Sequence, residues 1–320
     1  MDPHDGKLLR LGVSACLLGE NVRWNGGNKN DRVLVHDLSR YVEWVPICPE
    51  MEIGLGTPRP PIRLVDHGEG PRLVQPDQEI DLTDLMETWT QGFLDALEGP
   101  LHGWVLQETS PTCAPDKAKV YHPGGHVQAK SPGTFARRVK QRYPHLPMIG
   151  EGRLNHPELR EAFLDHAMAM RRWTDLVASA PSLAHLTEFH ARHKFTLMSH
   201  APEGQRHLGR IVADASGKPM DEVLHAYQRQ FGATMAKPAT RGKHANTLQH
   251  IQGFVKDHLD PNDTRELTHA ISDYHAGLVP LVVPLTLLRH HLRREKVDEW
   301  VLHQTYLDPY PREWMLRNHI

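Results

Sequence analysis

The sequence predicts an α/β N-terminal domain, a small parallel sheet with flanking helices, followed by an all-α C-terminal domain. Short apolar runs alternate with segments of helical spacing up to about residue 150, which is typical of parallel strands joined by crossover helices. Beyond residue 156 the strand-like runs fade, and long segments with a 3.6-residue apolar period take over. We therefore expect two domains, 1–155 and 156–320.

The first domain contains four predicted strands and three predicted helices. The first strand, 9–13, carries alternating Leu and Val and ends at Ser14-Ala15-Cys16, before a glycine-rich loop. Apolar positions at helical spacing predict helices after it, and a Pro-rich stretch with hairpin character spans 58–76. The further strands are expected at 45–48, 103–106 and 146–149, and the helices at 31–42, 81–97 and 135–143.

The second domain contains six predicted helical segments. Prolines at positions 181, 202, 219, 261, 280 and 284 supply breaks between them, because proline interrupts a helix. The segments are expected at 157–173, 181–200, 218–231, 241–259, 262–277 and 282–303.

The charge balance excludes a strong general attraction for nucleic acid or anionic membranes. Lys plus Arg number 37 and Asp plus Glu number 39, a net charge of −2, so any nucleic-acid contact has to be local. No apolar run approaches the roughly 20 residues of a membrane span, and acidic residues stand where a signal peptide would be basic. We expect a cytoplasmic protein without a membrane partner; the sequence does not indicate its oligomeric state.

All three cysteines of the chain, Cys16, Cys48 and Cys113, follow predicted strands. The carboxyl ends of parallel strands meet at one edge of the sheet, so we expect the thiols to converge there. An odd number of cysteines argues against a disulfide framework, and converging thiolates suit zinc or an iron–sulfur cluster. The alternative is that they are small buried hydrophobes. Their small, polar or proline neighbours favour a site.

Three stretches around these cysteines resemble the TudS-like thiouracil desulfidase family, over roughly residues 8–155. They occur in the expected order along the chain. The stretches are Val13-Ser14-Ala15-Cys16-Leu17-Leu18-Gly19 with Val22-Arg23-Trp24-Asn25-Gly26, then Cys48-Pro49-Glu50 with Gly54-Leu55 and Thr57-Pro58-Arg59-Pro60-Pro61, and finally Ser110-Pro111-Thr112-Cys113.

The resemblance implies a [4Fe–4S] cluster on Cys16, Cys48 and Cys113, with Glu50 and Ser110 as the catalytic pair. The implied reaction is a non-redox hydrolysis, of hydrolase or lyase type, that turns the C=S group of a thiouracil or thiouridine compound into C=O and releases sulfide. Such chemistry needs a thiophilic acceptor, an activated water and proton transfer. The other reading of Glu50 and Ser110 is that they only shape turns.

The resemblance leaves the substrate open between 2-thio and 4-thio compounds, and between free base, nucleoside, nucleotide and tRNA. Gln107-Glu108 and Ala114 depart from the family pattern, which has a basic residue and a glycine there; this bears on substrate preference. Arg23, Asn25 and Arg59 are the expected substrate-binding residues, because they lie in loops that should rim the pocket. Lys29 lies in the same loops. A basic helix face is a second candidate for contact with the phosphate of a nucleotide, or is only a solvated surface. That face carries Arg137, Arg138, Lys140 and Arg142.

Residues from about 185 to 315 resemble a helical domain of unknown function that occurs fused to such desulfidases. Its polar motif residues would form a phosphate or nucleic-acid groove, or serve as buried hydrogen-bond partners that align the helices. A rival to the enzyme is a non-enzymatic module with a metal clip, whose helical half binds nucleic acid or a protein partner. The polar motif residues are Lys194, Arg210, Lys243, His244 and Asn246; His193 and His200 share one face of a predicted helix.

Overall fold

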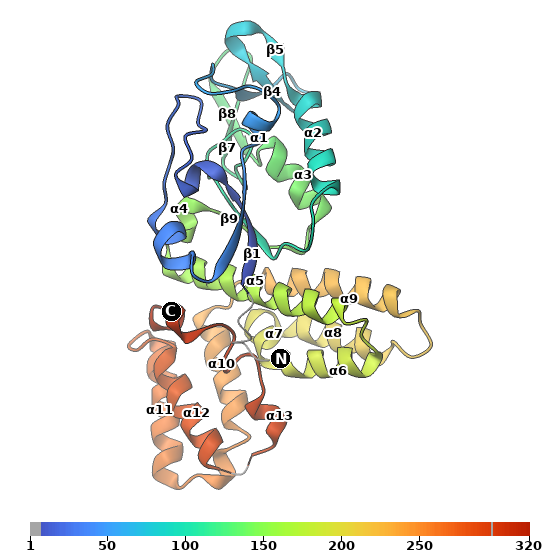
Figure 1. Cartoon of the computed structure of the whole chain (residues 1–320). Helices are drawn as coiled ribbons and strands as arrows, with labels where there is room; N and C mark the ends of the chain where they lie inside the picture. The colour runs from blue at the N-terminus through green and yellow to red at the C-terminus, as the bar shows by residue number, and fades with distance from the viewer. Residues whose placement is uncertain (1–7, 296) are drawn as a thin grey trace. The chain divides into compact units, whose positions relative to one another are not determined.

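The computed structural model describes residues 8–295 and 297–320 and divides into two compact units, Leu8–His156 and Pro157–Ile320 (Figure 1). The first unit contains the strands of the described chain, and the second is helical. The predicted fold class, an α/β N-terminal part followed by an all-α part, is confirmed.

The first unit is built on a four-stranded parallel sheet with the order β2-β1-β6-β9. The central strand β1 has almost no exposed apolar side chain, because a strand covered on both faces needs an apolar run. The predicted strands are therefore confirmed, although β2 begins three residues early. The bounds are β1 Leu9–Ser14, β2 Val42–Ile47, β6 Gly103–Leu106 and β9 Met148–Gly150.

Two helices, α2 (Thr83–Asp95) and α3 (Thr134–Arg142), lie side by side and cover one face of this sheet (Figure 1). Their apolar residues surround Trp104 of β6, whose ring meets the Phe135 ring edge-on with centroids 5.6 Å apart. Both helices were predicted from their apolar spacing. This packing fixes the strand whose carboxyl end leads into the Ser110–Cys113 loop.

The helix expected over 31–42 is instead a six-residue π-helix, Val33–Leu38. The Asp31 side chain begins it by accepting hydrogen bonds from the backbone N–H groups of Val33 and Leu34, at 2.9 and 3.3 Å. The chain then turns directly into β2 at Val42. Two short helices, α1 (Pro49–Glu52) and α4 (Glu151–Leu154), follow β2 and β9.

A second, five-stranded sheet with the order β5-β4-β3-β7-β8 was not predicted as a sheet. The hairpin character of 58–76 corresponds to the antiparallel pair β3 and β4. Of the other three strands, β5 has only two residues and β8 is mostly exposed and polar, so neither has the apolar alternation of a half-buried strand. The strand β7 has only four residues. The bounds are β3 Arg63–Asp66, β4 Pro71–Gln75, β5 Ile80–Asp81, β7 Ala118–Tyr121 and β8 Val127–Ser131.

The second unit packs its helices around apolar clusters, one of which contains Leu248, Ile271 and Leu288. The predicted segment 181–200 is two helices that meet at His193. The helix α8 was not predicted, because Pro202 begins a helix there instead of only ending one. Within the described ranges, no helix is long and apolar enough to cross a bilayer. The helices are α5 Pro157–Ala178, α6 Leu183–Arg192, α7 Lys194–His200, α8 Pro202–Ala213, α9 Met220–Met235, α10 Arg241–Gln252, α11 Pro261–Ala276, α12 Val282–Arg294 and α13 Glu299–Leu302.

Candidate functional site

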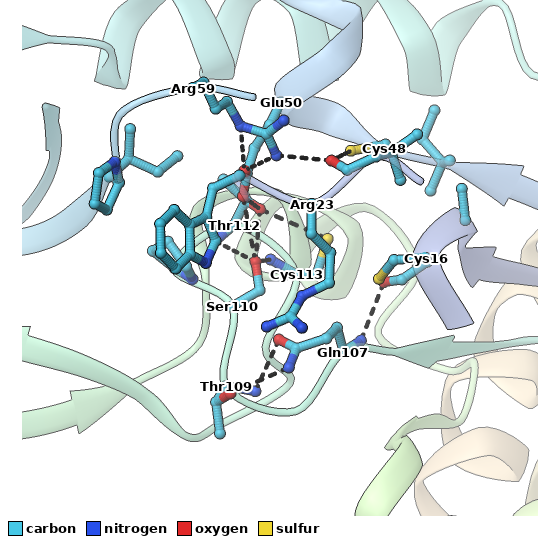
Figure 2. Close-up of a pocket in the computed structure, with 18 residues that line it drawn as sticks. Cys16, Arg23, Cys48, Glu50, Arg59, Gln107, Thr109, Ser110, Thr112 and Cys113 are labelled. Atoms are coloured by element: carbon cyan, nitrogen blue, oxygen red, sulfur yellow. Dashed lines mark hydrogen bonds and ion pairs between the residues drawn. The ribbon is translucent and has the colours of Figure 1, made fainter. Parts of the chain in front are cut away.

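Cys16, Cys48 and Cys113 line one pocket of about 250 Å³ in the first unit (Figure 2). Cys16 lies in the 3₁₀ turn Ala15–Leu18 that follows β1, and Cys48 directly follows β2. Cys113 lies in the loop after β6. The parallel order of these strands brings three residues that are far apart in sequence to one edge of the sheet.

Local backbone contacts hold each cysteine in place. Gly19 ends the Cys16 turn at a φ of 96°, a left-handed conformation that suits glycine. The carbonyl oxygen of Cys16 then accepts a hydrogen bond from the Lys29 amide at 2.8 Å. Cys48 caps α1, where Pro49 supplies a helical φ at the first position. The Ser14 hydroxyl oxygen accepts from the Gln107 amide at 3.0 Å, which joins the ends of β1 and β6.

Burial controls the charge of the three thiols. It raises the pKa of Cys16 and of Cys113 to about 12, and it also raises the pKa of Cys48. None of the three is in a disulfide. Thiols with such pKa values stay protonated at neutral pH, so only a tightly bound cation would convert them to thiolates.

The three thiols line the wall of the same pocket, and the charge of Cys48 acts on both of the other two. Cys48 Sγ lies 3.7 Å from the Val22 carbonyl oxygen, and Thr112 Oγ1 lies 3.6 Å from Cys113 Sγ. Across residues 8–295 and 297–320, no group of three or more His, Cys, Asp or Glu side chains could hold one metal ion. A cubane cluster binds each thiolate on a different iron atom. Three cysteine thiols on the wall of one pocket are the donor set that such a cluster requires.

Glu50 and Arg59 form a buried ion pair at this pocket. Arg59 Nε donates to Glu50 Oε2 at 3.0 Å, and Arg59 Nη2 donates to the same oxygen. The guanidinium also donates to the carbonyl oxygens of Gly56 and Val22, at 2.6 and 3.0 Å. Its side chain is 3% exposed. The expected substrate-binding residue Arg59 thus has its donors occupied by the protein, because its carboxylate partner lies on the neighbouring helix α1.

Ser110 and Thr112 meet the second oxygen of Glu50. Thr112 Oγ1 donates to Glu50 Oε1 at 2.8 Å, while Ser110 Oγ is 3.5 Å from that oxygen and 2.8 Å from Thr112 Oγ1. Figure 2 shows this line of contacts from Arg59 to Ser110. The structure therefore brings Glu50 and Ser110 together. Sequence reasoning gave Thr112 no role, although its place between Ser110 and Cys113 was a signal.

Of the loop residues expected to bind substrate, only Arg23 keeps its charged group available. Arg23 lines the pocket, and its charge acts on the Cys16 thiol. Within the described chain no side-chain hydrogen bond or ion pair engages its guanidinium. Asn25 is exposed, does not line the pocket, and accepts a hydrogen bond from the Gly27 amide at 3.2 Å. The loop curls Asn25 away through this local turn.

Lys29 and the basic face of α3 make structural ion pairs. Lys29 pairs with the buried carboxylate of Glu151, whose other oxygen accepts from the Glu108 amide at 2.6 Å. Glu151 thus joins the Cys16 loop to the loop after β6, a role that sequence reasoning missed. Arg137 and Arg138 both pair with Glu87 of α2, at 3.0 and 3.2 Å. These two arginines are therefore helix-packing residues.

Lys243 and His244 of the polar motif, together with His200, make hydrogen bonds to other groups of the second unit. His200 is buried and bonds Asp165 through Nε2 at 3.2 Å, and His244 bonds the Tyr306 hydroxyl at 3.0 Å. The Lys243 ammonium donates to the carbonyl oxygens of His200 and Pro238, both at 2.7 Å. Burial is the main cause that lowers the pKa of His244 to about 3. Lys243 and His244 therefore fit the second alternative, hydrogen-bond partners that align the helices.

The other four polar residues singled out in the sequence are elsewhere in the second unit. His193 is fully buried, and its Nδ1 meets the Phe189 carbonyl oxygen at 2.8 Å. Lys194 lies over the Trp300 ring, with its ammonium 5.0 Å from the ring centroid. Arg210 lines a separate shallow pocket between α8 and α9, and Asn246 is exposed. These residues do not form one continuous groove.

Comparison with known proteins gives matches for both halves. The 2-thiouracil desulfurase family matches residues 11–151, and a protein family of unknown function, DUF1722, matches residues 194–311. The uncharacterized protein YbgA of Escherichia coli (strain K12) is 30% identical over 134 residues, which are 42% of this chain and 79% of that protein.

A solved structure titled [4Fe–4S]-dependent thiouracil desulfidase TudS (DUF523Vcz) is 27% identical; the match covers 48% of this chain and 97% of that chain, with a TM-score of 0.36. The two family matches do not overlap, and residues 152–193 lie between them. The chain belongs to the 2-thiouracil desulfurase family in its N-terminal half and carries a DUF1722 domain in its C-terminal half.

Proposed function

We propose that this chain is a desulfidase that converts thiouracil-type bases, nucleosides or nucleotides to their oxo forms and releases sulfide. The observation that carries the proposal is one pocket lined by every cysteine of the chain together with Glu50 and Ser110. Membership of the 2-thiouracil desulfurase family supports the same substrate class, a thiolated pyrimidine. The catalytic unit would be residues 1–155, with 156–320 as a helical domain of no assigned activity.

Cys16, Cys48 and Cys113 would hold a [4Fe–4S] cluster as thiolates. When bound, the cluster would supply a Lewis-acidic iron without a protein ligand, which can accept and polarise the sulfur of the substrate. The protein supports the Cys113 thiolate, because a hydrogen bond from the Ser14 side chain lowers the pKa of Cys113 against the effect of burial. Three unpaired thiols suit a reducing compartment, so we place the protein in the cytoplasm.

The residues around the thiols would handle water and protons. Arg59 holds one oxygen of Glu50, and the other oxygen faces Thr112 and Ser110. Glu50 is therefore positioned as a general base for the water that attacks the ring carbon. Ser110 would orient the ring or pass on a proton. Arg23, whose guanidinium has no side-chain partner among the residues that the structure describes, would bind the phosphate of a nucleotide substrate.

The reaction balances as a hydrolysis. Water supplies the oxygen of the new C=O group and two protons, and the sulfur leaves as sulfide with those protons. No external oxidant, reductant or organic cofactor is needed, so a thiolated pyrimidine is the one small-molecule partner the scheme requires.

An anaerobic assay tests the proposal. Protein purified without oxygen would be incubated with 2-thio and 4-thio pyrimidines as bases, nucleosides and nucleotides, and sulfide release would be measured. Turnover of at least one compound, lost in a Cys113→Ser protein, is the expected result. A colourless zinc protein with no turnover would favour the rival, a structural metal clip.

A further inference from the structure

We propose that Thr112 is a positioning residue that joins Ser110 to Glu50 in one directed hydrogen-bond chain. The inference rests on the proposed function and deepens it, because it states how the two presumed reacting side chains are coupled. The three oxygens form a sequence with two links of 2.8 Å each, from Ser110 Oγ to Thr112 Oγ1 and from Thr112 Oγ1 to Glu50 Oε1.

Backbone amides set the direction at the Ser110 end. Ser110 Oγ accepts a hydrogen bond from the Thr112 amide at 3.2 Å and from the Cys113 amide at 3.1 Å. A hydroxyl oxygen has two acceptor lone pairs and one proton. Both lone pairs are therefore occupied, and the proton has to point to an acceptor. Thr112 Oγ1 at 2.8 Å is a better acceptor than Glu50 Oε1 at 3.5 Å.

Charge sets the direction at Thr112. Its single hydroxyl proton has two acceptors in reach, Glu50 Oε1 at 2.8 Å and Cys113 Sγ at 3.6 Å. A hydrogen bond to a carboxylate is shorter and about twice as strong as one between neutral groups. The Thr112 hydroxyl therefore donates its hydrogen bond to Glu50 Oε1. Thr112 is fully buried, so solvent does not compete for its hydroxyl.

The surrounding backbone holds both ends rigidly. Arg59 donates to the other carboxylate oxygen of Glu50, so Oε1 stays turned toward Thr112. The Thr112 carbonyl oxygen accepts from the Ala136 amide of α3 at 3.2 Å. Gly133, at the start of α3, touches Thr112 so closely that a Cβ there would lie 2.4 Å from its carbonyl carbon. The chain of hydroxyls is thus fixed before any substrate binds.

The directed chain gives Ser110 a route for a proton. Ser110 Oγ can accept a proton from water or from the ring once it gives up one of its two hydrogen bonds from backbone amides. Its own proton then passes to Thr112 Oγ1, and the Thr112 proton passes to Glu50 Oε1. Both hydroxyls end neutral, Glu50 becomes a carboxylic acid, and no electrons are exchanged with another group. Thr112 itself does not touch the substrate in this scheme, and it acts through Ser110 and Glu50.

Thr112→Val tests the inference, because valine keeps the branched shape and removes the hydroxyl. We expect kcat to fall by about 10²-fold, the lower end for loss of assisted proton transfer, with KM, iron content and the visible absorption unchanged. Thr112→Ser, which restores a hydroxyl, should recover most of kcat. The matched control is Thr90→Val in α2, another fully buried threonine, whose hydroxyl donates only to Met86 of its own helix.

A double-mutant cycle separates this inference from the proposed function. The urea midpoints of Thr112→Val, Glu50→Gln and the double variant should be non-additive, whether or not the protein turns over substrate. If the wild-type protein were inactive but the cycle non-additive, the proposed function would be refuted and the hydrogen-bond chain would still be supported. Four results would each overturn the role of Thr112. They are additive midpoints in the cycle, a wild-type kcat in Thr112→Val, loss of iron in Thr112→Val, and failure of Thr112→Ser to recover kcat.

Discussion

The Glu50–Arg59 pair gives a stability prediction that needs no substrate. Arg59→Ala would leave the Glu50 carboxylate, which is 12% exposed, without its cation, and would leave two carbonyl oxygens without their donor. Removing one partner of a buried ion pair typically costs 3–5 kcal/mol, so we expect unit 8–156 to lose about that free energy of unfolding. Arg59→Lys keeps the positive charge but not the forked geometry of the guanidinium. Its free energy of unfolding should therefore lie between those of the wild-type chain and of Arg59→Ala.

The assay is amide hydrogen exchange of the full chain at increasing urea concentrations, read out on the peptides from residues 8–156. It reports the stability of this unit separately from that of the helical unit. The control is Arg72→Ala, which removes the exposed ion pairs of Arg72 with Asp81 and Asp84 and should change little. If Arg59→Ala were as stable as the wild-type chain, or no less stable than Arg72→Ala, the view of Arg59 as a buried structural partner would be refuted.

Three further predictions address the site and the helical unit. Gly133→Ala places a Cβ 2.4 Å from the Thr112 backbone and should cost about 1–3 kcal/mol, whereas Gly92→Ala in α2 meets nothing within 4 Å and should stabilise slightly; equal urea midpoints would contradict this. Glu50→Gln should keep iron and lower kcat by about 10²-fold or more; near-normal turnover would remove Glu50 from the mechanism. Burial, and then the charge of Asp165, raise the pKa of Glu161 to about 7, above its unfolded value, so the stability it contributes is complete below the unfolded pKa and is lost as pH rises through about 7. Glu161→Gln should not show this loss. If the difference in free energy of unfolding between the wild-type chain and Glu161→Gln were constant from pH 5 to 8, the role of Glu161 would be refuted.

Sequence reasoning succeeded where burial and chain order decide the structure. The strands β1 and β6 are covered on both faces and so appear as continuous apolar runs. The meeting of three distant cysteines follows from the parallel order of their strands. Both features are encoded in patterns that span only a few residues, and both were predictable without a structure.

Features that depend on partners across the fold were not predictable. The ion pair of Arg59 with Glu50 on α1 is one example, because it forms only once the loop between them has folded back. Thr112 owes its contacts to the turn that begins at Ser110. The strand β8 is mostly exposed and polar, so its membership of a sheet depends on pairing with β7 rather than on its own pattern.

The most direct test of the account is the iron and acid-labile sulfide content of protein purified without oxygen. We predict about four iron atoms per chain in the wild-type protein, as one [4Fe–4S] cluster requires. Replacing any one of Cys16, Cys48 or Cys113 by serine should remove the cluster, because each would be a ligand from a different strand end. Full iron occupancy in Cys48→Ser protein, or zinc in place of iron in the wild type, would contradict the three-thiolate cluster.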